Sequence, residues 1–163
     1  MDKNTILALT SVPDYIQQIR KQGKRIVVAG GCFDILHNGH LRFLRNAKAE
    51  GDILMVLLES DAAIAQSKGK GRPVNSQQER AEMLSAFRDV DAVVLLPAFA
   101  SDTDYDNVIN TIKPAIIATT KGDPWRIHKE RQAKFVGAQV VDVIELIQNK
   151  STTAIATLLA KEL

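Results

Sequence analysis

The chain has 163 residues, of which 45% are hydrophobic and 25% are charged, and this composition is typical of a soluble globular protein. Its 21 basic and 19 acidic side chains give a net charge of +2, which is too balanced to indicate a nucleic-acid or membrane surface. A single cysteine, no secretory signal and no apolar run of membrane-spanning length favour a reducing, cytoplasmic location.

Apolar runs alternate with amphipathic segments along the chain. Residues 1–24 are expected to form a helical lead-in, with a helix at 13–20 that ends before Gly23. The apolar runs predict strands at 25–29, 53–59, 92–96, 115–119 and 139–143. Helices are predicted at 40–51, 76–88, 105–112, 126–136 and 151–163, and a basic, glycine-rich loop at 66–75.

This alternation predicts the fold class, which is α/β. We expect residues 1–163 to form a single Rossmann-like domain, a doubly wound parallel sheet of about five strands with helices on both faces. Ligands of such sheets bind beyond the carboxyl ends of the strands. The chemistry is therefore expected in the segments that follow the strands, at 30–40, 60–75, 97–104, 119–126 and 144–152.

The segment GGCFDILHNGH follows the first of these predicted strands and leads into a helix. Gly39 would let a phosphate approach the backbone, and the helix start offers free N–H groups and a positive dipole end. His37 and His40 add two side-chain donors at the same point. A zinc site is the alternative, but two histidines without the glutamate of the protease motif make a poor one. The pattern favours phosphate binding.

The run His37-Asn38-Gly39-His40 resembles the signature of the HIGH-motif nucleotidyltransferases, and the residues before it resemble the cytidylyltransferase-like branch of that superfamily. Three later stretches agree in order and spacing: the KGKGRPVN loop (68–75) with Glu79-Arg80, the turn Lys121-Gly122-Asp123, and Ser151-Thr152-Thr153. Within the branch, the closest resemblance is to heptose-1-phosphate adenylyltransferase domains of bacterial lipopolysaccharide-precursor synthesis. Gly30 and the glycine-aspartate-x-tryptophan order ending at Trp125 depart from that pattern, and the second is similar to glycerol-phosphate cytidylyltransferases.

The resemblance implies transfer of a nucleoside monophosphate, with AMP from ATP favoured, to a phosphorylated small molecule such as a heptose 1-phosphate, with release of pyrophosphate. A cytidylyltransferase acting on glycerol phosphate or a similar polyol phosphate is the alternative enzyme. A catalytically inactive nucleotide-binding regulatory protein is the alternative of another class. Mg²⁺ is expected to enter with the nucleoside triphosphate. No nucleic-acid or membrane partner is expected, and a homodimer is left open.

The resemblance also assigns roles to individual residues. Catalysis is assigned to His37, His40, Lys68 and Lys70. Nucleotide or phosphate binding is assigned to Gly31, Cys32, Phe33, Asp34, Gly39, Arg72, Arg80, Lys121, Gly122, Asp123, Ser151, Thr152 and Thr153. No residue is assigned as a metal ligand. Several alternatives stay open: Mg²⁺ or nucleotide for the two aspartates, base stacking or packing for Trp125, and substrate contact or a surface ion pair for Arg80.

Overall fold

The computed structural model describes residues 5–145, and within them six strands form one parallel sheet in the order β1-β4-β3-β2-β5-β6. The strands are β1 (Thr5–Ala8), β2 (Ile26–Gly31), β3 (Ile53–Leu58), β4 (Ala92–Leu95), β5 (Ile116–Thr120) and β6 (Gln139–Ile144). The predicted Rossmann-like parallel sheet is confirmed, with one more strand than expected.

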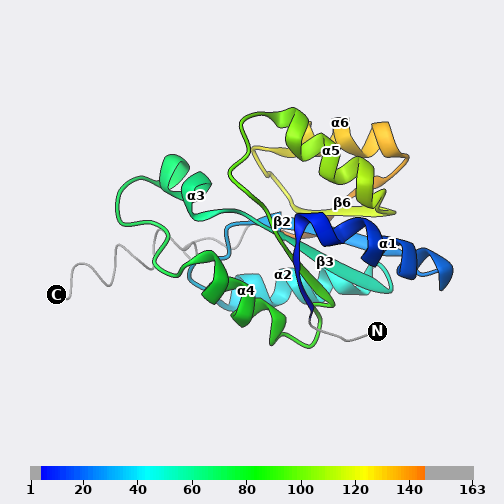
Figure 1. The fold of residues 1–163 in the computed structure, drawn as a ribbon, viewed down its shortest axis with the longest axis horizontal. Coiled ribbons are helices and arrows are strands. Elements are labelled where there is room, and N and C mark those ends of the chain that lie inside the picture. The colour runs from blue at the N-terminus through cyan, green and yellow to red at the C-terminus, as the bar shows by residue number, and fades with distance from the viewer. Residues whose placement is uncertain (1–4, 146–163) are drawn as a thin grey trace.

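Helices cover both faces of the sheet (Figure 1). They are the short 3-10 helix η1 (Leu9–Ser11), α1 (Val12–Lys21), α2 (Asn38–Ala49), α3 (Asp61–Lys68), α4 (Gln77–Ser85), α5 (Asp102–Ile112) and α6 (Arg126–Val136). The buried side chains of α1, α5 and α6 pack in one hydrophobic cluster, and those of α2 and α4 pack in a second. The sheet therefore separates two apolar layers, as in a doubly wound fold.

Strand β3 shows why these apolar runs form strands. All six of its side chains are buried, because β2 and β4 pair with its two edges and helices cover its two faces. Successive residues such as Met55 and Val56 point to opposite faces of the sheet and belong to different clusters. A strand buried on both faces reads as a continuous apolar run, which is why the sequence predicted it.

Two elements were not predicted from the sequence. Strand β1 pairs only with β4 at the edge of the sheet, so the lead-in expected to be helical begins with a strand. Helix α3 extends to Lys68, so the expected loop at 66–75 begins three residues too early. Gly69 ends this helix with a φ of 88°. The predicted helix at 151–163 lies outside the described residues.

The strand order reverses beside β2. Strand β3 pairs with one edge of β2 and β5 with the other, so the chain crosses from β4 to the opposite side of β2 to form β5. A reversal of strand order of this kind opens a ligand-binding crevice at the carboxyl ends of the strands. The segments that follow β2, β3 and β5 meet at this end.

Candidate active site

Two histidines stand together where β2 ends and α2 begins. The rings of His37 and His40 stack with their centroids 4.0 Å apart and an interplanar angle of 29°. His37 is the N-cap of α2, and its Nδ1 accepts a hydrogen bond of 3.1 Å from the backbone N–H of Gly39. The N-terminus of α2 thus combines two imidazoles with the positive end of a helix dipole, an arrangement suited to an anion.

Phe33 supports His40 from the turn after β2. The buried Phe33 ring lies 5.2 Å from the His40 ring, centroid to centroid. Phe33 has a φ of 46°, in a region that side chains rarely adopt, and a Cβ on Gly31 would lie 2.9 Å from its ring. Gly31 and Phe33 therefore shape the turn beneath the histidine, and their contact with nucleotide stays a prediction.

His40 is held in its neutral form. Burial, and to a lesser extent the neighbouring His37, lowers the pKa of His40 from 6.5 to about 4. Among the described residues, His40 Nδ1 is the one buried side-chain nitrogen or oxygen without a hydrogen-bond partner. Leaving such an atom without a partner costs about 1–3 kcal/mol. The folded protein thus keeps an uncharged imidazole at the N-terminus of α2, although one of its nitrogens has no hydrogen bond.

The lowered pKa of His40 makes folding stability depend on pH. The unfolded chain binds a proton on this imidazole near pH 6.5, but the folded protein does so only near pH 4. The contribution is therefore complete above about pH 6.5 and is lost as the pH falls towards about 4. At about 1.4 kcal/mol per pKa unit, we expect a loss of about 3 kcal/mol. Urea denaturation at pH values from 7 to 4 gives the free energy of unfolding at each pH, and this free energy should fall less steeply with decreasing pH in His40→Gln than in the wild type. An equal pH dependence in the two proteins would contradict the neutral state of His40.

Asp34 holds the basic loop against the end of β2. Its buried carboxylate accepts hydrogen bonds from Arg72 Nε at 2.6 Å and from the backbone N–H groups of Val74 and Asn75 at 2.8 and 3.0 Å. Burial alone would raise the pKa of Asp34, but these hydrogen bonds hold it below its ordinary value. Asp34 takes only the Nε–H of Arg72, so a phosphate contact by the Nη groups of Arg72 is compatible with this pair.

Lys68 and Lys70 lie on either side of Gly69, at the beginning of the same loop. Both lysine side chains are exposed, in contrast to the tethered Arg72. Burial is the main cause of the raised pKa of the Cys32 thiol, and Lys68 acts against it electrostatically. Lys68 is therefore near Cys32, in the turn after β2.

Arg80 lies inside the protein. Its Nε donates to the carbonyl of Asn75 at 3.1 Å, and its Nη1 donates to the carbonyl of Cys32 at 2.6 Å. Its Nη2 donates to the carbonyl of Glu59 at 2.9 Å and to Asp61 Oδ1 at 2.7 Å. One guanidinium thus connects the segments after β2 and β3 with the basic loop. The surface ion pair considered from the sequence is wrong, because the Arg80 side chain is 0% exposed.

The turn Lys121-Gly122-Asp123 follows β5, on the other side of β2 from β3. Asp123 accepts hydrogen bonds from Thr119 Oγ1 at 2.7 Å and from Lys129 Nζ at 2.5 Å. Burial alone would raise the pKa of Asp123, but these hydrogen bonds hold it below its ordinary value. Trp125 is 66% exposed at the end of this turn, so it is not a core residue. Lys121 pairs with Glu145 at the surface.

Other predicted features fall outside this site or outside the described residues. Ser151, Thr152 and Thr153 are not among the described residues, so their anion binding stays a prediction. Within residues 5–145, no group of three or more histidine, cysteine, aspartate or glutamate side chains is placed to hold a metal ion. In the same part of the chain, no helix is long and apolar enough to cross a membrane.

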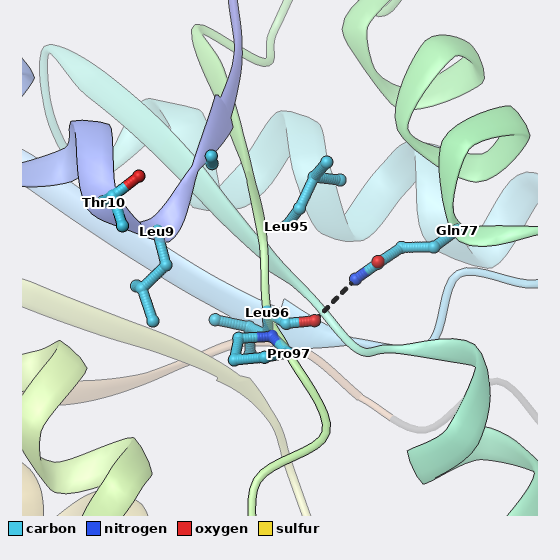
Figure 2. A pocket seen from close by; sticks show the side chains of 7 residues that line it. Leu9, Thr10, Gln77, Leu95, Leu96 and Pro97 are labelled. Carbon is cyan, nitrogen blue, oxygen red and sulfur yellow. Dashed lines mark hydrogen bonds between the residues drawn. The ribbon is translucent and has the colours of Figure 1, made fainter.

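A depression lies apart from the histidines, at the carboxyl ends of β1 and β4 (Figure 2). Its volume is about 440 Å³, and it is lined by residues 8–10, residues 95–97 and Gln77. Gln77 Nε2 donates to the carbonyls of Leu58 and Leu96, so it joins the ends of β3 and β4. None of the predicted site residues lines this depression, so we place the candidate active site at the turn after β2.

Sequence reasoning did not assign Glu59 or Tyr105. Glu59 follows β3 directly, and Tyr105 Oη donates a hydrogen bond of 2.8 Å to Glu59 Oε2. The available signal was the place of Glu59, a charged residue directly after a buried strand at the ligand-binding end of a parallel sheet. Tyr105 carried no such signal, because it lies inside helix α5.

Comparisons with known proteins agree with this geometry. A family model described as cytidylyltransferase-like matches residues 28–156. The chain belongs to the cytidylyltransferase-like family. The matched range contains the histidine turn, the basic loop, the turn after β5 and residues 151–153. The superfamily resemblance predicted from the sequence is therefore confirmed.

Curated relatives in this family carry the name bifunctional protein HldE. The protein from Nitratiruptor sp. is 42% identical over 139 residues, which cover 85% of this chain and 28% of the relative. The protein from Pseudomonas fluorescens is 35% identical over 158 residues, which cover 96% of this chain and 32% of the relative. The chain thus spans about three-tenths of the length of these relatives.

Solved structures show the same fold. The crystal structure of a lipopolysaccharide core biosynthesis protein from Thermoplasma volcanium is 26% identical, with a TM-score of 0.61, and covers 78% of this chain and 100% of that one. A pantoate-beta-alanine ligase from Francisella tularensis has a TM-score of 0.64 at 16% identity, and covers 94% of this chain and 76% of that one. At this lower identity, the second likeness concerns the fold alone.

Proposed function

We propose that the chain is a nucleotidyltransferase that transfers AMP from ATP to a sugar phosphate such as a heptose 1-phosphate and releases pyrophosphate. The stacked His37 and His40 at the N-terminus of α2, beside the point where the strand order reverses, carry this proposal. Membership of the cytidylyltransferase-like family supports the reaction type. The sequence resemblance to heptose-1-phosphate adenylyltransferase domains and the relatives named HldE support the nucleotide and the acceptor class.

The reaction needs little acid or base from the protein. An oxygen of the acceptor phosphate attacks the α-phosphorus of ATP, the new P–O bond forms, and the bond to the β-phosphate breaks as pyrophosphate leaves. A phosphate oxygen is already ionised near neutral pH, so catalysis depends on positioning and on stabilising the charge. His37 and His40 would donate hydrogen bonds to the triphosphate at the N-terminus of α2.

The exposed lysines would complete the phosphate site. Lys68 and Lys70 lie beside Gly69, while Arg72 and Asn75 anchor the later part of the loop to Asp34. This arrangement lets the lysines close over a bound triphosphate while the end of the loop stays in place. The turn at 121–123, on the other side of β2, would bind the rest of the nucleotide, and the sequence resemblance assigns residues 151–153 to the same task.

The residues present fit a magnesium ion that is held mainly by the substrate. The carboxylates of Asp34 and Asp123 already accept hydrogen bonds from protein groups, and no cluster of metal-ligating side chains occurs within residues 5–145. Mg²⁺ would neutralise part of the triphosphate charge when bound, with the phosphate oxygens as its main ligands. We further propose a cytoplasmic protein that acts without nucleic acid. A homodimer stays a prediction.

Pyrophosphate release with each nucleoside triphosphate and a panel of sugar and polyol phosphates tests this function. We expect ATP to exceed CTP by at least about tenfold in kcat/KM, since a hydrogen-bonded base pocket leaves polar groups unpaired with the wrong base. The panel should include heptose 1-phosphates and glycerol phosphate. Equal or faster turnover with CTP and glycerol phosphate would replace the adenylyltransferase by the cytidylyltransferase alternative. No pyrophosphate with any pair would favour the inactive regulatory protein.

A further inference from the structure

Glu59 has a fixed backbone position at the carboxyl end of β3. Its N–H donates to the carbonyl of Gly31 at 3.2 Å, and its carbonyl accepts the Nη2 of Arg80 at 2.9 Å. The Nη1 of the same arginine donates to the carbonyl of Cys32. Glu59 is therefore tied directly to the turn that leads to the two histidines.

Tyr105 holds one half of the Glu59 carboxylate. Its Oη donates to Glu59 Oε2 at 2.8 Å, and its ring packs edge-on against Phe99 with the centroids 4.8 Å apart. A tyrosine supported in this way presents its hydroxyl with little rotational freedom. Glu59 and Tyr105, which we call the Glu59–Tyr105 pair, thus form a rigid polar group contributed by the segment after β3 and by α5.

The other carboxylate oxygen of Glu59 has hydrogen-bonding capacity left. Oε1 accepts no hydrogen bond from the described part of the chain, and it is not one of the buried side-chain atoms without a partner. Glu59 as a whole is partly exposed. Burial raises the pKa of Glu59, against the opposing effects of Tyr105 and Arg80. A partly buried carboxylate has lost some of its hydration, which is unfavourable. Hydrogen bonds from donors such as hydroxyl groups compensate for this loss.

The pair lies on the side of β2 that faces away from the turn at 121–123. That turn follows β5 on one edge of β2, whereas Glu59 follows β3 on the other. The Cys32 thiol, whose pKa burial raises, is influenced electrostatically by both Lys68 and Glu59. Arg80 also donates to the carbonyls of both Glu59 and Asn75 of the basic loop, so Glu59 and this loop lie close enough to contact opposite ends of one small molecule.

We propose that the Glu59–Tyr105 pair binds hydroxyl groups of the sugar in the acceptor, and this inference rests on the proposed function. Glu59 Oε1 accepts hydrogen bonds from one or two neighbouring hydroxyls, and the Tyr105 oxygen accepts another. The negative carboxylate repels phosphate, so the acceptor binds with its phosphate towards the histidines and lysines and its polyhydroxylated end towards β3 and β4. The pair is thus a determinant of acceptor specificity.

The test compares Glu59→Gln and Tyr105→Phe with the wild type. Glu59→Gln keeps the size of the side chain and an oxygen for Tyr105, but loses the charge. Tyr15→Phe is the matched control, because it removes the hydroxyl of the other tyrosine, which is buried on α1 and has no hydrogen bond to Glu59. We expect both site variants to raise KM for a heptose 1-phosphate by about tenfold or more, with KM for ATP within about twofold. The control should change neither.

Acceptor binding is also measured by calorimetry without ATP, so the result does not depend on turnover. Heptose 1-phosphate should bind about tenfold more weakly to the site variants, whereas inorganic phosphate should bind all four proteins equally. A raised KM for ATP with an unchanged acceptor KM would overturn the proposal and assign the pair to the nucleotide ribose. Unchanged acceptor affinity in both variants would also overturn it. If the wild type binds heptose 1-phosphate but does not turn it over, the proposed function is contradicted. The acceptor affinities of the variants then still test whether the pair binds the sugar.

Discussion

The His40→Ala variant is expected to lose about 10²–10³-fold in kcat while keeping its fold. The imidazole is neutral, stacks on His37 and stands at the N-terminus of α2, where a donor acts on charge that develops at the α-phosphorus. Removing the ring also removes a buried atom that has no partner, which limits the loss of stability. Pyrophosphate release at saturating substrates measures the effect, and circular dichroism checks the fold.

His37 requires a different substitution, because it also caps α2 through Gly39. His37→Ala would combine a lost donor with a lost N-cap, which typically costs about 1 kcal/mol. His37→Asn is the matched variant, since asparagine caps helices well and lacks the distal ring nitrogen. We expect His37→Asn to fall about 10²-fold in kcat at nearly wild-type stability. Near-normal turnover in both histidine variants, with the fold intact, would remove these residues from the mechanism.

The largest expected effect on stability is that of Arg80→Met. The substitution leaves three partly buried backbone carbonyls and the Asp61 carboxylate without their shared donor. Removing one partner of a buried charged network typically costs about 3–5 kcal/mol. Urea denaturation should therefore show a loss of this size for Arg80→Met. Arg88→Met is the matched control, because the Arg88 side chain is 83% exposed and should cost less than about 0.5 kcal/mol.

A loss below about 1 kcal/mol for Arg80→Met would contradict the role of Arg80 as the internal connector of these segments. Direct phosphate binding by this side chain would then regain support. The prediction also bears on the Glu59–Tyr105 pair, because Arg80 holds the backbone of Glu59.

Much of the fold could be predicted from the sequence because the sheet is buried on both faces. Continuous apolar runs such as 53–58 are typical of buried parallel strands. The glycines and histidines after β2 indicate its ligand-binding end. Strand β1 was missed because a four-residue edge strand is too short to show a period. Helix α3 was missed because, among its eight residues, only Ile64 is buried, so it has almost no apolar stripe.

The site was predicted as a set of motifs, but the contacts among them could not be. Asp34 and Arg72 belong to different motifs, and only the fold shows that they bind each other across 38 positions of the chain. The inward orientation of Arg80 depends on carbonyls that the sheet brings together, and arginine is usually an exposed residue. The Glu59–Tyr105 hydrogen bond joins residues 46 positions apart, which no local pattern reports.

Transfer of label from ATP tests the central claim most directly. The protein is incubated with Mg²⁺, a heptose 1-phosphate and ATP labelled either at the α- or at the γ-phosphate, and the products are separated. We predict that the α-label appears in a sugar linked to adenosine through a diphosphate, and that the γ-label appears only in pyrophosphate. His40→Ala protein prepared in the same way controls for contaminating enzymes. Transfer of the γ-label to the sugar, or release of the α-label as free AMP alone, would contradict the account.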